Sequence, residues 1–179
     1  MRVIAGELGG RRLQTARGIA TRPTAGRVRE ALFSMLGELA AATEVLDLFA
    51  GSGALGIEAL SRGAARATFV ERSPRALAAL RANVAALGLR ERARVLEEDA
   101  LTALRGPAKY DLVFLDPPYA MAAELAGVLS SRLPAALRPG ARVVSESDRR
   151  APLELALPLL RERRYGDTMI RIHEKSEGT

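Results

Sequence analysis

The chain has 179 residues, of which 48% are hydrophobic and 27% are charged, and this composition is typical of a globular protein with one domain. The absence of cysteine excludes disulfides and thiolate chemistry, and a single histidine, His173, argues against a zinc site, so we expect no metal. No apolar run approaches the length of a membrane span, and the N-terminus lacks the apolar stretch of a signal peptide. We therefore expect a cytoplasmic protein without membrane contact.

The first 36 residues carry most of the net charge of +6, because seven arginines stand there against two glutamates. Such an end suits a polyanionic partner, and a basic segment that merely faces solvent is the alternative. The pattern of residues 2–15 predicts a β-hairpin with a Gly9-Gly10 turn, and residues 16–23 are expected to form a loop. Thr24 is expected to be the N-cap of a helix over 25–39. We divide the chain into this basic hairpin and loop (1–23), a main domain (24–174) and a polar tail (175–179).

The stretch 44–60 opens with a short apolar run, breaks at Gly51 and Gly53, and resumes with helical spacing near Leu55. This pattern predicts a buried strand, a tight turn and a helix N-terminus whose free N–H groups face a ligand. With Gly56 the glycines also match the dinucleotide fingerprint, and Glu71 follows the next strand near the ribose-binding position. The turn alone leaves open a dinucleotide, another nucleoside ligand, or no ligand.

The rest of the chain alternates strands with helices. Strands are predicted over 67–70, 93–97, 110–115 and 142–146, helices over 74–87 and 123–137, and two antiparallel strands over 155–164 and 168–172. This alternation predicts an α/β fold with a mostly parallel sheet and helices on both faces. The first four strands end at the glycine turn, Glu71, Asp99 and residues 116–119. Because ligands bind at the carboxyl ends of such strands, we expect these clusters to form one site.

The most specific motif is Asp116-Pro117-Pro118-Tyr119. Two prolines make a rigid elbow that holds the Asp116 carboxylate and the Pro117 carbonyl as hydrogen-bond acceptors. These two groups would bind the protons of a planar –NH2 group and orient its nitrogen lone pair toward an electrophile. Tyr119 offers a flat surface on which a base would stack. The alternative is an ordinary Asp-Pro turn.

Several motifs together resemble the class I S-adenosylmethionine-dependent amino-methyltransferases: Asp47-x-Phe49-x-Gly51-x-Gly53, Glu71, Asp99 and residues 116–119. Residues 2–6, 22–24, 27–33 and 166–168 narrow the resemblance to the bacterial 16S rRNA guanine-N2 methyltransferase family (RsmD-like), over nearly the whole chain. It implies a Rossmann-like class I methyltransferase fold: a seven-stranded, mostly parallel sheet with an antiparallel C-terminal strand, and the β-hairpin as a small N-terminal extension. It also favours a methyltransferase over a nicotinamide enzyme, which has no use for an amine-binding elbow.

The resemblance implies roles for named residues. Asp47 would face the cationic amino end of S-adenosylmethionine, Glu71 the ribose, Asp99 the adenine amine and the Ala100 N–H the adenine ring. Asp47 would otherwise satisfy loop amides, and Asp99 would otherwise cap a helix. The expected cofactor-binding residues are Thr24, Asp47, Phe49, Ala50, Gly51, Ser52, Gly53, Glu71, Arg72, Asp99, Ala100 and Asp116. The expected catalytic residues are Asp116, Pro117, Pro118 and Tyr119, and the expected RNA-binding residues are Arg2, Arg11, Arg12, Arg17 and Arg22.

The implied reaction methylates the N2 amine of one guanine in 16S ribosomal RNA, in the small ribosomal subunit, and leaves S-adenosylhomocysteine. We expect the protein to act as a monomer. Two alternatives remain: a DNA adenine-N6 or cytosine-N4 methyltransferase, for which the chain has little room to hold a target-recognition domain, and a non-catalytic RNA-binding factor of ribosome assembly.

Overall fold

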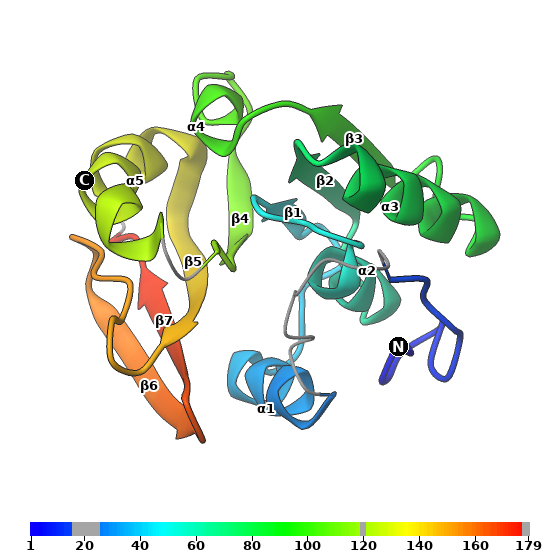
Figure 1. The fold of residues 1–179 in the computed structure, drawn as a ribbon, viewed down its shortest axis with the longest axis horizontal. Coiled ribbons are helices and arrows are strands. Elements are labelled where there is room, and N and C mark those ends of the chain that lie inside the picture. Colours follow the sequence, from blue (N-terminus) through cyan, green and yellow to red (C-terminus); the bar gives the residue numbers. More distant parts are fainter. Residues whose placement is uncertain (16–25, 119–120, 177–179) are drawn as a thin grey trace.

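The computed structural model describes residues 1–15, 26–118 and 121–176 (Figure 1). Its elements follow in the order α1 (Gly26–Leu36), β1 (Glu44–Asp47), α2 (Ala54–Ser61), β2 (Arg66–Glu71), α3 (Pro74–Ala86), β3 (Ala93–Glu97), α4 (Ala100–Ala103), β4 (Tyr110–Leu115), α5 (Ala122–Ala136), β5 (Leu137–Asp148), β6 (Leu159–Tyr165) and β7 (Thr168–Glu174). Within these described ranges, none of the helices combines the length and the apolar character needed to cross a bilayer.

All seven strands form one sheet in the order β3-β2-β1-β4-β5-β7-β6. Strands β1 to β5 pair in parallel, and β7 runs antiparallel to both of its neighbours. The predicted mostly parallel sheet with an antiparallel C-terminal strand is therefore confirmed. Strand β1 lies between β2 and β4, so the chain leaves the middle of the sheet in two directions. Ligands of such sheets bind at this reversal, outside the carboxyl ends of the central strands.

Helices cover both faces of the sheet, because side chains alternate along each strand. Val45 and Phe114 contribute to a core with α1, α2 and α3, while their neighbours Leu46 and Val113 contribute to a second core with α4 and α5. These strands are apolar on both faces, as buried parallel strands are.

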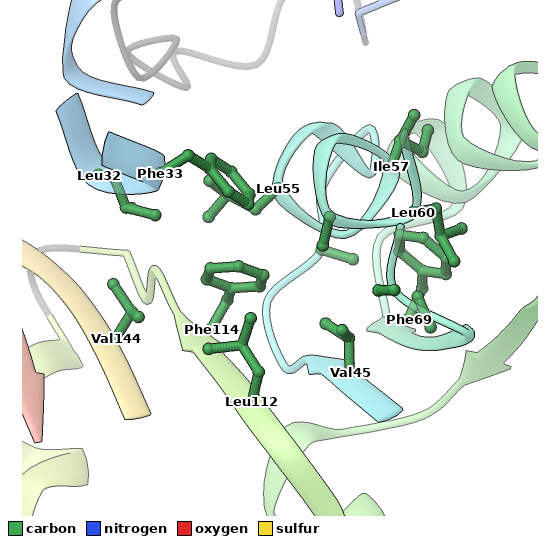
Figure 2. Close-up of a cluster of buried hydrophobic side chains, with 14 of the residues drawn as sticks. Leu32, Phe33, Val45, Leu55, Ile57, Leu60, Phe69, Leu112, Phe114 and Val144 are labelled. Atoms are coloured by element: carbon green, nitrogen blue, oxygen red, sulfur yellow. The ribbon is translucent and has the colours of Figure 1, made fainter. Parts of the chain in front are cut away.

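Helix α1 closes the first core over the middle of the sheet. Leu32 and Phe33 point from α1 toward Phe114 of β4 and Val144 of β5 (Figure 2). The rings of Phe33 and Phe114 have centroids 5.7 Å apart and are tilted by 54°, a favourable arrangement for an aromatic pair. This contact fixes α1 over the end of β4, directly before the expected catalytic residues 116–119.

Several element boundaries differ from the predictions. Helix α1 ends at Leu36 rather than near residue 39, because Gly37 turns the chain with φ 72°. Strand β5 begins at Leu137, before the expected start, and a register shift opposite Tyr110 and Leu112 accommodates the Pro139-Gly140 step. The short helix α4 has no apolar periodicity by which it could be predicted, and it was missing from the predicted elements.

The N-terminal segment is less regular than the predicted hairpin. It folds back on itself through a single antiparallel bridge between Arg2 and Arg12. The chain between them bonds to the end of α2 instead, where the Glu7 N–H donates to the Ser61 carbonyl (2.8 Å). A side chain at Gly6 would lie 1.8 Å from that carbonyl oxygen, so only glycine fits at this approach. The ends of the segment pair as in a hairpin, and the Arg11 N–H donates to the Leu8 carbonyl (3.1 Å) across the predicted Gly9-Gly10 turn, whereas backbone N–H groups between residues 4 and 8 are used for docking.

A buried ion cluster completes this docking. The Glu58 carboxylate, fully buried in α2, accepts hydrogen bonds from the Ile4 N–H (2.8 Å), the Ala5 N–H (3.1 Å) and Arg62 Nε (2.8 Å). The Arg29 guanidinium lies 3.7 Å from the same carboxylate, and burial lowers the pKa of Arg29. Because a buried carboxylate needs these partners, the N-terminal segment is fixed to the main body.

Candidate active site

The carboxyl ends of the central strands bring together polar groups that are far apart in the sequence. Asp47 ends β1, Glu71 ends β2, Asp116 follows β4 and Glu146 lies near the end of β5. Asp47 pairs in register with Phe114, two residues before Asp116, so the ends of β1 and β4 lie side by side. The structure thus gathers the expected clusters at one edge of the sheet.

The glycine turn after β1 has two glycines with different surroundings. Gly51 (φ 55°) and Gly53 (φ 85°) both have left-handed backbones, which glycine adopts most easily. A Cβ at Gly51 would meet nothing within 4 Å, whereas a Cβ at Gly53 would lie 2.5 Å from Leu80 Cδ1 in the core. Only at Gly51 does the missing side chain leave open space for a ligand to approach the backbone.

Gly56, the third glycine of the fingerprint, serves packing. A Cβ there would lie 2.3 Å from the Phe69 ring, so its absence allows α2 to lie close to β2. Within the turn the Gly53 N–H donates to the Ala50 carbonyl (2.7 Å), and Phe49 is half-buried against the second core.

Glu71, expected at the ribose, also organises the turn. Its Oε2 accepts from the Gly51 N–H (2.9 Å), and its Oε1 accepts from the Arg72 N–H (2.9 Å) and the Ser73 N–H (2.7 Å). A carboxylate has about four acceptor positions, so these three bonds leave capacity for a ligand hydroxyl. One side chain thus fixes the glycine turn and the start of α3 relative to each other.

Asp47, expected at the cationic end of the cofactor, is 1% exposed, and its Oδ2 accepts a hydrogen bond from the Gly56 N–H (3.0 Å). Burial raises the pKa of Asp47 to about 7; the bond from Gly56 opposes this shift and the Glu71 carboxylate adds to it. The alternative role as an acceptor for loop amides is therefore present in the structure. A cation bound nearby would favour the charged form of the same carboxylate.

Asp99 caps the short helix α4, since its Oδ1 accepts from the Leu101 N–H (2.9 Å). Its other oxygen lies 3.6 Å from the Arg72 guanidinium, and both side chains are well exposed. Ala100 is the first residue of α4, a position at which the backbone N–H has no partner within the helix. Arg72, Asp99 and Ala100 therefore flank the ends of β2 and β3, where the adenine end of a nucleoside was expected.

Asn83 links the glycine turn to the N-terminal segment, a role absent from the predictions. Its Nδ2 donates to the Ser52 carbonyl (2.9 Å) and to the Gln14 carbonyl (3.0 Å), and its Oδ1 accepts from the Gln14 N–H (2.7 Å). The side chain is 2% exposed. Asn83 is the only asparagine in the chain, but no local pattern indicates which distant backbone groups it binds.

Asp116 and Pro117 form the elbow after β4, with Asp116 partly exposed, Pro117 buried and Pro118 exposed. Burial raises the pKa of Asp116 well above its usual range, and the carboxylates of Glu146 and Asp47 raise it further. Glu146 and Asp47 therefore each lie within electrostatic reach of Asp116. Over the described ranges, no cluster of three or more acidic or histidine side chains has the geometry to hold a metal ion.

Glu146 is the residue of this group that was missing from the predicted site. It is 5% exposed, in a buried polar run of Ser145, Glu146 and Ser147 that follows the apolar pair Val143 and Val144 in β5. The predicted site includes the first four strand ends and leaves out the fifth. Three consecutive polar residues at a buried strand end were the available signal.

The expected RNA-binding arginines Arg2, Arg11 and Arg12 are exposed on the docked N-terminal segment. Arg2 Nη1 donates to the Gly10 carbonyl (2.6 Å) and Arg11 Nη2 to the Ala86 carbonyl (3.2 Å), so part of each guanidinium supports the local backbone. Four further expected site residues lie outside the described residues: Arg17, Arg22, Thr24 and Tyr119.

The strand order, the glycine turn after β1 and the Asp-Pro-Pro elbow after β4 define a class I methyltransferase fold. The chain belongs to the family described as "Conserved hypothetical protein 95", whose family model matches residues 1–174. The RsmD-like resemblance of the sequence motifs is thereby confirmed.

Individual relatives agree with this assignment. YlbH of Bacillus subtilis (strain 168) is 38% identical over 185 residues, which cover 98% of this chain and 99% of that protein. Ribosomal RNA small subunit methyltransferase D of Haemophilus influenzae is 35% identical over 182 residues, which cover 97% of this chain and 93% of that protein. The solved RNA methyltransferase of Salinibacter ruber in complex with S-adenosyl-L-homocysteine has a TM-score of 0.65 at 22% identity, covers 88% of this chain and 95% of that one, and supports the fold alone.

Proposed function

We propose that this protein transfers the methyl group of S-adenosylmethionine to the N2 amine of a guanine in 16S ribosomal RNA. The observation that carries the proposal is the Asp116-Pro117 elbow after β4, placed beside the glycine turn at the end of β1. The name of the Haemophilus relative supports RNA of the small ribosomal subunit as the substrate. The elbow supports an exocyclic amine as the methylated group.

The residues around the glycine turn fit a nucleoside cofactor with a cationic centre. Gly51 leaves open space beside its backbone, and Glu71 keeps one acceptor position beyond its three backbone bonds. The Asp47 carboxylate contributes to the raised pKa of Asp116, and two carboxylates placed in this way favour a positively charged ligand. When bound, S-adenosylmethionine supplies a methyl carbon that its positive sulfur makes electrophilic.

Asp116 and the Pro117 carbonyl would position the amine. Each accepts one N–H of the guanine amine, which reduces delocalisation of the nitrogen lone pair into the ring and aims it at the methyl carbon. Taking up the methyl group would give the amine nitrogen positive charge, and the amine would then release one proton to water. An ionised Asp116 stabilises this developing charge, and the nearby cation favours the ionised form.

The N-terminal segment would hold the RNA backbone. Exposed Arg2, Arg11 and Arg12 are suited to phosphate contacts, and the Glu58 cluster fixes their position relative to α2. A guanine must leave its stack to reach the elbow, which favours an unpaired or bulged target.

Steady-state methyl transfer to small ribosomal subunits that lack the modification tests this proposal. We expect Asp116→Ala to lower kcat by at least about a hundredfold with little change in KM, since the amine contact acts mainly in the transition state. Asp116→Asn keeps an acceptor oxygen without the charge, so partial activity would assign the main contribution to lone-pair orientation.

Asp111→Asn is the matched control, because Asp111 lies near the start of β4, at the opposite end of that strand from Asp116, and is also partly exposed. It should keep near-normal turnover. Near-normal turnover in a folded Asp116→Ala variant would overturn the proposed role of the elbow.

A further inference from the structure

Glu146 and Asp116 occupy equivalent positions at the ends of two neighbouring strands. Strands β4 and β5 pair in parallel, with Phe114 opposite Val144 and Leu115 opposite Ser145. Asp116 directly follows β4, and Glu146 is the next residue of β5. Figure 2 shows Phe114 and Val144 on the face of the sheet that α1 covers. Because side chains alternate along a strand, we expect the side chains two residues further on, Asp116 and Glu146, on this same face.

The two carboxylates are near each other as well as equivalent. Paired strands lie about 4.8 Å apart, and the Glu146 carboxylate contributes to the raised pKa of Asp116. On its other side Glu146 is opposite Ile170 of β7, a fully buried apolar residue. Two neighbouring carboxylates, one buried and one partly exposed, repel each other, so a ligand that brings hydrogen-bond donors to both is stabilised there.

Guanine presents such donors in a row along its Watson–Crick edge: the two protons of the N2 amine and, beside them, the proton on N1. Asp116 and the Pro117 carbonyl account for the amine protons in the proposed function. The N1–H then needs an acceptor next to Asp116, on the same face. Adenine and 2-aminopurine have a bare N1 lone pair there, which a carboxylate repels.

We infer that Glu146 accepts the N1–H of the target guanine and thereby selects guanine over purines whose N1 carries no proton. This inference rests on the proposed function. A carboxylate has about four acceptor positions, so a bond to N1–H is compatible with bonds that Glu146 makes within the protein. Reading a displaced base through its Watson–Crick edge is a general device of enzymes that modify bases.

The test compares two small-subunit substrates, one with guanine and one with 2-aminopurine at the methylated position. 2-Aminopurine keeps the 2-amino group but has no proton on N1. The wild-type protein should methylate it about 10- to 100-fold less efficiently than guanine, the range expected for losing a hydrogen bond to a charged group. Glu146→Gln and Glu146→Ala should lower kcat/KM on guanine by about tenfold or more and reduce the discrimination to a few-fold.

The discrimination ratio is kcat/KM on guanine divided by kcat/KM on 2-aminopurine. 2-Aminopurine also lacks the O6 atom of guanine, but this loss affects all variants alike and cancels when their ratios are compared. Glu91→Gln is the control, because Glu91 is exposed and precedes β3, at the opposite edge of the sheet. It should keep both the rate and the ratio. Thermal melting and calorimetric binding of S-adenosylhomocysteine establish that each variant is folded with an intact cofactor site.

The outcomes separate the two proposals. Failure of the folded wild-type protein to methylate guanine N2 would overturn the proposed function together with the inference. If the wild-type protein methylates guanine and both Glu146 variants keep its discrimination ratio, the inference alone would be overturned. Equal losses of kcat/KM on both substrates would also overturn it and would assign Glu146 a structural role. If Glu146→Ala does not fold, Glu146→Gln decides; equal wild-type rates on the two substrates would refute the inference without any variant.

Discussion

Gly51→Ala should mainly weaken cofactor binding, whereas Gly53→Ala should mainly destabilise the fold. Both positions have left-handed backbones, which cost a residue with a Cβ about 1–2 kcal/mol. At Gly53 the new methyl group would also lie 2.5 Å from Leu80 Cδ1 and 3.1 Å from Ile57 Cδ1, and such overpacking costs about 1–3 kcal/mol more. At Gly51 the methyl group meets no protein atom and enters the space expected for the cofactor.

The free energy of unfolding should therefore fall by about 1–2 kcal/mol in Gly51→Ala and by about 2–5 kcal/mol in Gly53→Ala. For a chain of this size that corresponds to Tm decreases of roughly 2–8 °C and 4–20 °C. Cofactor affinity, measured by calorimetry well below both melting temperatures, should fall at least about tenfold in Gly51→Ala. Unchanged affinity in Gly51→Ala, or equal destabilisation of the two variants, would refute the assignment of Gly51 to the ligand and Gly53 to packing.

Three further predictions concern charge and the N-terminal segment. Replacing Arg11 and Arg12 by alanine should reduce the slope of log RNA affinity against log salt by about 1.4–1.8, with cofactor affinity unchanged; an unchanged slope would indicate a segment that only faces solvent. Asp47 has a pKa near 7 in the folded state, above its unfolded value, so its contribution to stability decreases as pH rises from about 4 to 7. Asp47→Asn should flatten that dependence in denaturant titrations, and an identical pH profile would contradict the buried carboxyl. Asn83→Ala removes three hydrogen bonds and should lower the free energy of unfolding by about 3 kcal/mol while weakening cofactor binding, which melting and calorimetry would measure.

The sheet could be predicted from sequence because its signals are local. Apolar strands such as 110–115 alternate with helices that begin at Pro74 or end near a glycine, and each such segment can be recognised from its own residues. The sites at the ends of β1, β2 and β4 followed from topology, since parallel strands bring their carboxyl ends together. The Asp116-Pro117 elbow was predictable for the same reason.

What could not be predicted depends on contacts between distant segments. Two glycines of one fingerprint, Gly51 and Gly53, differ only in what their missing side chains would meet. The predicted hairpin keeps its Gly9-Gly10 turn and the bridge between its ends. Between them, Glu58 and Ser61, 54 and 53 residues away from the groups that they bind, take up the backbone N–H groups of Ile4 and Leu8. Strand register brings Glu146 beside Asp116, and no stretch of sequence specifies that register by itself.

The chemical identity of the methylated nucleoside tests the central claim most directly. Purified protein and isotopically labelled S-adenosylmethionine are incubated with small ribosomal subunits that lack the modification, and the RNA is digested to nucleosides for mass spectrometry. We predict one labelled product, N2-methylguanosine, at about one per subunit with the wild-type protein and at background with Asp116→Ala. A label in N6-methyladenosine or N4-methylcytosine, or no label with a folded protein that binds the cofactor, would contradict the claim.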